Sequence, residues 1–184
     1  MIEKILKAKH WQIFLLIVEP PFLIELAIMG SFDSKMATIA ILIVAFLYML
    51  ELSVWLWAIA IGLQNKLPEE IKMKVGLFKI FFIIAFSYIV LISLVITFAF
   101  DKIEIDVVAF NKPSIALIAG IFIVFHLFVT YCLFYCLYFV AKVFKTVELQ
   151  RKTTVSDFAL DFLLFGLFPI GLWLVQPKIN QMMK

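Results

Sequence analysis

The first hydrophobic segment of the chain reads WQIFLLIVEPPFLIELAIMGSF and runs from Trp11 to Phe32. It is apolar enough to cross a bilayer, yet Glu19, Pro20 and Pro21 lie in its middle. Proline removes a backbone donor and clashes with the preceding turn, so a kink or break of the helix is expected at Pro20 and Pro21. A carboxylate at this depth is costly in hydrocarbon and needs shelter. The segment therefore predicts a broken membrane helix that is sheltered by neighbouring helices.

The composition of the whole chain points to lipid as its solvent. The chain has 184 residues, of which 65% are hydrophobic and 16% charged, and its mean hydropathy is +1.12. Soluble domains are only about 45–50% apolar. The chain has no basic stripe interleaved with aromatic residues, so we expect no direct contact with nucleic acid. Residues 1–184 are therefore interpreted as a single membrane domain.

Hydrophobic runs predict four transmembrane helices, at about 11–32, 37–63, 78–100 and 114–140. A fifth apolar segment, about 156–176, is shorter and contains Pro169; Thr154 and Asp157, three residues apart, are typical of a helix start just before it. It is either a fifth crossing or a short kinked helix that is re-entrant or interfacial, and we favour the second because the run is interrupted. The predicted fold class is all-α: an integral membrane helical bundle of four transmembrane helices plus a short kinked C-terminal helix.

The placement of the basic residues predicts a topology. They cluster before the first span, between the second and third spans, and after the fourth, where Lys142, Lys145, Arg151 and Lys152 lie. Cytoplasmic loops are enriched in lysine and arginine, so the N-terminus is expected in the cytoplasm. The four basic residues after the fourth span are expected to face a partner or lipid headgroups.

Three ionisable residues lie at similar depth on three different spans: Glu19, Glu51 and His126. Histidine changes protonation near neutral pH, and ionisable residues inside a membrane often mark ion or proton pathways. One hypothesis is therefore an ion-binding or proton-linked cluster. The alternative is structural, with buried acids that hydrogen-bond to aromatic partners and fix the register of the helices.

One face of the second span carries Tyr48, Trp55, Ala58 and Gly62 at helical spacing. This face is first polar and then small, which favours close packing against another helix. Cys132 and Cys136 are the only cysteines and lie on one apolar helix, so we expect them to pack and to form no zinc site. We expect no cofactor and no metal.

The ends of the chain carry a resemblance. KAKHWQ at 7–12, FPIGLW at 168–173 and QPKIN at 176–180 resemble small, uncharacterised multi-span bacterial inner-membrane proteins. The resemblance implies location in a bacterial inner membrane. In size and topology the chain is also similar to small multi-span proteins encoded with bacterial antiviral systems, including those beside RNA-targeting CRISPR nucleases.

Two functions from different classes follow from these observations. The first is a homo-oligomeric membrane protein that forms a pore or ion-linked channel, as an effector of a bacterial antiviral system. The second is a non-catalytic accessory or regulatory subunit that docks a cytoplasmic protein partner. An enzyme is the minor alternative, because two carboxylates and a histidine suit acid–base chemistry on a lipid-like substrate but no catalytic motif is present.

Overall fold

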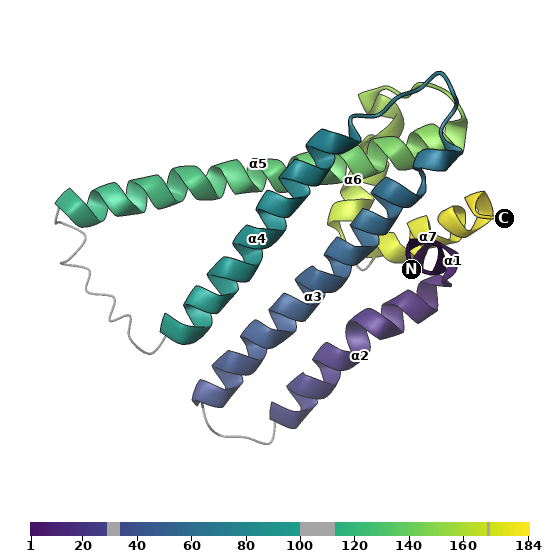
Figure 1. Cartoon of the computed structure of the whole chain (residues 1–184). Coiled ribbons are helices and arrows are strands. Elements are labelled where there is room, and N and C mark those ends of the chain that lie inside the picture. Colours follow the sequence, from purple (N-terminus) through teal and green to yellow (C-terminus); the bar gives the residue numbers. More distant parts are fainter. Residues whose placement is uncertain (29–33, 100–112, 169) are drawn as a thin grey trace.

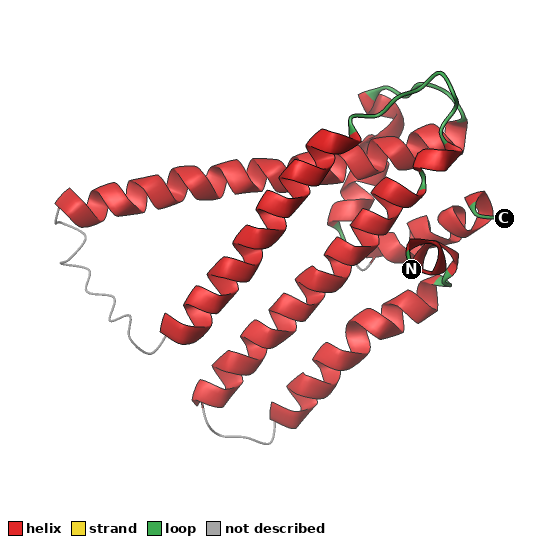
Figure 2. Cartoon of the chain, viewed as in Figure 1, coloured by secondary structure: helices red, strands yellow, loops and turns green. Residues whose placement is uncertain are grey.

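The structure is a computed structural model that describes residues 1–28, 34–99, 113–168 and 170–184. Every regular element within these ranges is a helix (Figure 2). The elements are α1 (Ile2–Lys7), α2 (His10–Ile28), α3 (Ser34–Gly62), the 3-10 helix η1 (Gln64–Lys66), α4 (Val75–Ala99), α5 (Pro113–Leu149), α6 (Val155–Gly166) and α7 (Ile170–Met182).

Three helices are long and apolar enough to span a membrane, which indicates an integral membrane protein. Their candidate spans are Ile39–Lys66, Val75–Val95 and Ala119–Leu149, on α3, α4 and α5. The shortest of these helices, α4, has 25 residues. At about 1.5 Å per residue it is longer than the hydrocarbon core of about 30 Å. The hydrophobic runs at 37–63, 78–100 and 114–140 are thus confirmed as apolar helices of spanning length, although residue 100 lies outside the described residues.

The fourth of these predicted spans ends later than expected. We predicted an end near residue 140, but α5 continues to Leu149. Its last turns are amphipathic: Val143, Phe144 and Val147 are buried in the core, whereas Lys142 and Lys145 alternate with them. α6 packs along α5, and the apolar face of these last turns gives it a surface to pack against. This packing stabilises the helix beyond residue 140.

The helix of the first predicted span is continuous through its two prolines. The helix break expected at Pro20 and Pro21 is not found, because α2 runs as one helix from His10 to Ile28. Two prolines remove two backbone donors, but the other backbone groups of the segment stay in one helix, and α2 packs along α3. Residues 29–32 lie outside the described residues, so a crossing by 11–32 stays a prediction.

The C-terminal segment is two short helices where one kinked helix was predicted. α6 has 12 residues and α7 has 13. At about 1.5 Å per residue each is about 20 Å long or less, too short to cross a core of about 30 Å. The predicted break point, Pro169, lies outside the described residues. Gly171 sits directly against the backbone of Leu164, where a Cβ would overlap the Leu164 carbonyl, so the two helices meet in close backbone contact.

The long helices and the short ones occupy different parts of the molecule. α2, α3 and α4 lie side by side, whereas α5 crosses α4 and its N-terminal half diverges from the other helices (Figure 1). α1, α6 and α7 gather at the end of the bundle where both chain termini lie (Figure 1). The main core is at this end and includes Trp55, Phe78, Phe144, Phe165 and Leu172.

Candidate functional site

The structure does not join the three ionisable residues that were predicted to form an intramembrane cluster. Glu51 is half-buried on α3, while Glu19 on α2 and His126 on α5 are exposed. Among the described residues, no hydrogen bond or ion pair connects any two of them. Oε2 of Glu51 is buried and has no hydrogen-bond partner among the described residues. A shared site for these three groups within one chain therefore stays a prediction.

His126 has a different partner, which sequence reasoning did not identify. Its Nδ1 lies 2.8 Å from the hydroxyl oxygen of Tyr88 on α4, and Tyr88 is buried in a small core with Ala85, Val129 and Cys132. The tyrosine O–H donates to an unprotonated Nδ1, or accepts when Nδ1 carries the proton. This pair links α5 to α4.

One stretch in the N-terminal half of α5 is exposed. Every residue from Ile121 to Phe128 is exposed, His126 included. A groove of about 770 Å³ follows this half of α5 and is lined by Leu117, Gly120, Ile121, Val124, Phe125 and Phe128. A Cβ added at Gly120 would meet no neighbouring atom within 4 Å. This face, which we call the α5 face, is apolar and has no covering helix in the described chain; His126 does not line it.

The predicted packing face of α3 meets the two ends of the chain. Tyr48 is half-buried, while Trp55 and Ala58 are completely or almost completely buried. Gly62 faces Leu6 of α1, whose side chain would have to move if a Cβ were added. The indole N–H of Trp55 donates to Oε1 of Gln176 on α7 over 2.9 Å. The face therefore packs against α1 and α7.

Gln176 and Asn180 join the two termini in an arrangement that we call the terminal latch. Nε2 of Gln176 donates to the carbonyl oxygens of Ile5, Leu6 and Ala8 at 3.2, 3.1 and 2.9 Å. Nδ2 of Asn180 donates to those of Leu6 and Ala8 at 2.8 and 3.0 Å. The last carbonyls of a helix have no partner within it, so the latch satisfies the C-terminal end of α1.

Aromatic rings extend the terminal latch toward α2. The ring of Trp173 lies 4.7 Å from that of His10 and 5.4 Å from that of Phe14, measured between centroids. His10 and Trp173 belong to the two terminal segments that carry the resemblance in the sequence. The spacing of Gln176 and Asn180, four residues apart on one helix, was the signal for a shared face.

Lys145, one of the predicted partner-facing residues, forms ion pairs within the protein. Nζ of Lys145 lies 2.6 Å from Glu148 and 3.2 Å from Asp161, and its side chain is only 18% exposed. Glu148 also pairs with Lys178 of α7 at 3.0 Å. Carboxylates of α5 and α6 therefore compensate the charge of Lys145 within the chain, and its docking role stays a prediction.

Arg151 is also engaged within the chain. Its guanidinium donates to both carboxylate oxygens of Asp157 at 2.7 and 3.2 Å. The backbone N–H and the hydroxyl of Thr154 donate to the same carboxylate at 2.8 and 2.9 Å. The Arg151 hydrogen bond, followed by those from Thr154, holds the pKa of Asp157 well below its usual range. Thr154 and Asp157 thus begin α6, as their spacing predicted.

The other two predicted basic residues, Lys142 and Lys152, line a polar cavity of about 230 Å³. Lys72, from the connector between η1 and α4, lines the same cavity, as do Thr146 and Thr153. We call this the lysine cavity. It lies beside the ends of α4 and α5.

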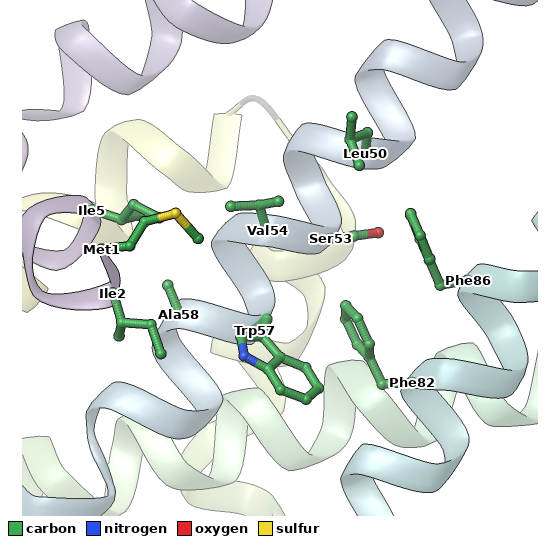
Figure 3. Close-up of a pocket in the computed structure, with 10 residues that line it drawn as sticks. All are labelled: Met1, Ile2, Ile5, Leu50, Ser53, Val54, Trp57, Ala58, Phe82 and Phe86. Atoms are coloured by element: carbon green, nitrogen blue, oxygen red, sulfur yellow. The ribbon is translucent and has the colours of Figure 1, made fainter. Parts of the chain in front are cut away.

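A second cavity, of about 210 Å³, is apolar (Figure 3). Ile2 and Ile5 of α1 line one side and Phe82 and Phe86 of α4 the other, with Trp57 of α3 between them. Ser53 also lines it, but its hydroxyl donates to the carbonyl of Met49 at 2.6 Å. The cavity therefore offers apolar contacts.

No match was found. Comparison with protein-family models, curated proteins and solved structures gives no similar family, protein or fold for this chain. Within the described residues, no group of three or more histidine, cysteine, aspartate or glutamate side chains is placed to hold a metal ion. The interpretation of function therefore depends on the α5 face, the lysine cavity and the charges in the long helices.

Proposed function

We propose that this is an integral protein of the bacterial inner membrane whose copies assemble through the α5 face into an oligomer. The oligomer forms a pore or ion-linked channel, and the N-terminus lies in the cytoplasm. The observation that carries the proposal is the exposure of His126 within a run of exposed apolar residues, Ile121 to Phe128. Apolar side chains alone are satisfied by lipid, but an exposed imidazole is not.

The physical argument concerns the polar groups. Ionisable side chains in membrane helices face other helices or water because hydrocarbon offers them no hydrogen bond. His126 uses Nδ1 for Tyr88, which leaves Nε2 for a second partner. Glu51 has a buried oxygen that lacks a partner in the described chain. An assembly gives both groups neighbours or a water-filled path.

The shape of α5 supports contact between copies. Gly120 has open space around it and lies in the groove of the α5 face. Small residues on membrane helices allow close helix–helix approach, and polar side chains then hydrogen-bond across the contact. A second α5 is a suitable occupant because it brings the same apolar surface and the same small residue, Gly120.

Disulfide crosslinking in the native membrane tests the proposed interface. In a Cys132→Ala/Cys136→Ala background, Val124→Cys places a thiol on the α5 face, where Val124 is 69% exposed. Leu91→Cys is the matched control on α4, where Leu91 is 59% exposed. We expect covalent dimers with the first variant and mostly monomers with the second. Equal crosslinking of both would overturn the α5 interface.

An accessory subunit that docks a soluble partner is the second candidate function. It is favoured by the exposed Lys72 and Lys152, which lie in the connectors before α4 and before α6. If it is correct, Lys152→Glu changes the activity of the partner system, whereas Glu51→Gln and His126→Ala leave it intact. If the channel proposal is correct, the two membrane substitutions change ion flux and Lys152→Glu does not.

A further inference from the structure

The lysine cavity lies where the headgroups of a bilayer meet the protein. The candidate span of α4 begins at Val75 and that of α5 ends at Leu149. Lys72 comes three residues before the first boundary, and Lys142 lies two turns inside the second. The cavity is thus at the end of two membrane-length helices that run in opposite directions. A group bound there is at the level of lipid phosphates.

The residues that line the lysine cavity carry a net positive charge. Lys72, Lys142 and Lys152 line it together with one acidic residue, Glu70. Among the described residues, the ion pairs found involve Lys7, Lys145, Arg151 and Lys178, and none of the three cavity lysines. By contrast, the neighbouring Lys145 and Arg151 are neutralised by carboxylates. Three ammonium groups are therefore available to one anion.

One of the three lysines is positioned by its own helix. Nζ of Lys142 lies 3.4 Å from the hydroxyl of Tyr138 and 5.6 Å from the centre of its ring. An ammonium group has three donors, so the single bond to Tyr138 leaves two N–H groups for a ligand. The ring holds the cation at the wall of the cavity without neutralising its charge.

Two buried hydroxyl groups complete the donor set. Oγ1 of Thr146 lies 2.8 Å from Oγ1 of Thr153, and both residues are at least 95% buried. When two hydroxyls share one hydrogen bond, only one of them donates, so the other keeps its proton for another acceptor. Both line the cavity. The cavity therefore offers a neutral donor beside three cationic ones.

We propose that the lysine cavity binds the phosphate group of an anionic phospholipid. Lysine binds phosphate as a point charge, and basic residues next to a membrane helix attract anionic lipids. The location at the ends of α4 and α5 favours a lipid as the source of the phosphate over a soluble compound. The net positive charge favours a phosphodiester without a compensating cation, such as phosphatidylglycerol, over zwitterionic phosphatidylcholine.

Native mass spectrometry of the delipidated, detergent-solubilised chain tests this site. Phosphatidylglycerol and phosphatidylcholine are titrated separately, and the bound fraction of each is measured. We expect phosphatidylglycerol to bind more tightly. We expect Lys142→Gln/Lys152→Gln to weaken its binding about tenfold or more, because two charge-assisted hydrogen bonds are lost. Lys142→Arg/Lys152→Arg keeps both charges and should retain binding.

The matched control removes the same charge from the same end of the bundle. Lys74 and Lys79 are exposed and do not line the cavity, so Lys74→Gln/Lys79→Gln should change binding less than about twofold, as expected for distant surface charges in water. Equal weakening by the two double variants would show general surface attraction and would overturn the site. Equal binding of the two lipids to the unmodified chain would also overturn it.

The source of the phosphate is tested separately. Inorganic phosphate and glycerol 3-phosphate are added to the delipidated chain at the concentrations used for the lipid. Weak or absent binding of both supports a lipid headgroup. If either binds as tightly as phosphatidylglycerol, and Lys142→Gln/Lys152→Gln abolishes it, the cavity takes a soluble phosphate compound and the lipid proposal is wrong. The melting temperature of each variant confirms that it is folded.

Discussion

The terminal latch makes a quantitative prediction for Gln176→Leu. Gln176 is completely buried and bonds the indole N–H of Trp55 at 2.9 Å. Leucine leaves this buried N–H without a partner, at a cost of about 1–3 kcal/mol, and the bond to Ile5 is lost at about 1 kcal/mol. Leu6 and Ala8 keep their bonds from Asn180. The expected loss in the free energy of unfolding is therefore about 2–4 kcal/mol.

Thermal unfolding in detergent measures this loss. A fluorogenic maleimide reacts with Cys132 and Cys136, which are both buried in the folded chain, so its signal reports unfolding. At about 2–4 °C per kcal/mol for a chain of this size, Gln176→Leu should lower the melting temperature by about 5–15 °C. The control is Gln181→Leu, the same substitution at an exposed position of α7, which should change stability by less than about 0.5 kcal/mol.

A double-mutant cycle isolates the hydrogen bond. In a Trp55→Phe background no indole N–H is left unpaired, so Gln176→Leu should cost about 1–3 kcal/mol less than in the unmodified chain. The reasoning is refuted if Gln176→Leu and Gln181→Leu have the same melting temperature. It is also refuted if Gln176→Leu lowers the free energy of unfolding equally in the Trp55→Phe background and in the unmodified chain.

Two further predictions concern the C-terminal helices. Gly171→Ala places a methyl group against the Leu164 carbonyl and should destabilise the chain by about 1–3 kcal/mol; Gly120→Ala, in open space, should be neutral or stabilising, as melting temperatures would show. Asp157→Asn removes a carboxylate whose pKa is lowered by Arg151, so the stability that this carboxylate contributes is present above its ordinary pKa and is lost as the pH falls through the lowered value. The melting temperatures of wild type and Asp157→Asn should therefore differ at neutral pH and converge in acid.

Each of these two predictions has a clear contrary result. If Gly171→Ala melts no lower than Gly120→Ala, α6 and α7 do not need the close contact that a glycine allows. If the gap between wild type and Asp157→Asn is constant from neutral pH to strong acid, the carboxylate charge contributes nothing to folding. A gap that widens toward acid would reverse the sign of the linkage.

Local sequence patterns predicted the local features of the fold. Long apolar runs identified three of the helices, because burying a run in lipid depends on its length and composition alone. The pair Thr154 and Asp157 identified the start of α6, because a cap forms between residues three apart. A break of the helix was not found at Pro20 and Pro21, where α2 continues as one helix and packs along α3.

Features that join distant segments were not predictable in this way. Gln176 and Leu6 are 170 residues apart, and nothing in either segment names the other as a partner. Lys145 was grouped with the partner-facing residues because it lies in a cluster of basic residues in the sequence. Its partner Asp161 is 16 residues away and reaches it only because α6 packs on α5. Tyr88 was likewise missed as the partner of His126.

The measurement that tests the proposed channel most directly is ion flux into liposomes that contain the purified, folded protein, over a pH series. We predict flux in wild type, a change in its magnitude or pH dependence with Glu51→Gln and with His126→Ala, and an unchanged oligomer with Glu51→Gln. Ion-tight liposomes that contain correctly inserted oligomer, or flux that neither substitution alters, would contradict the proposal that these groups serve a conducting assembly.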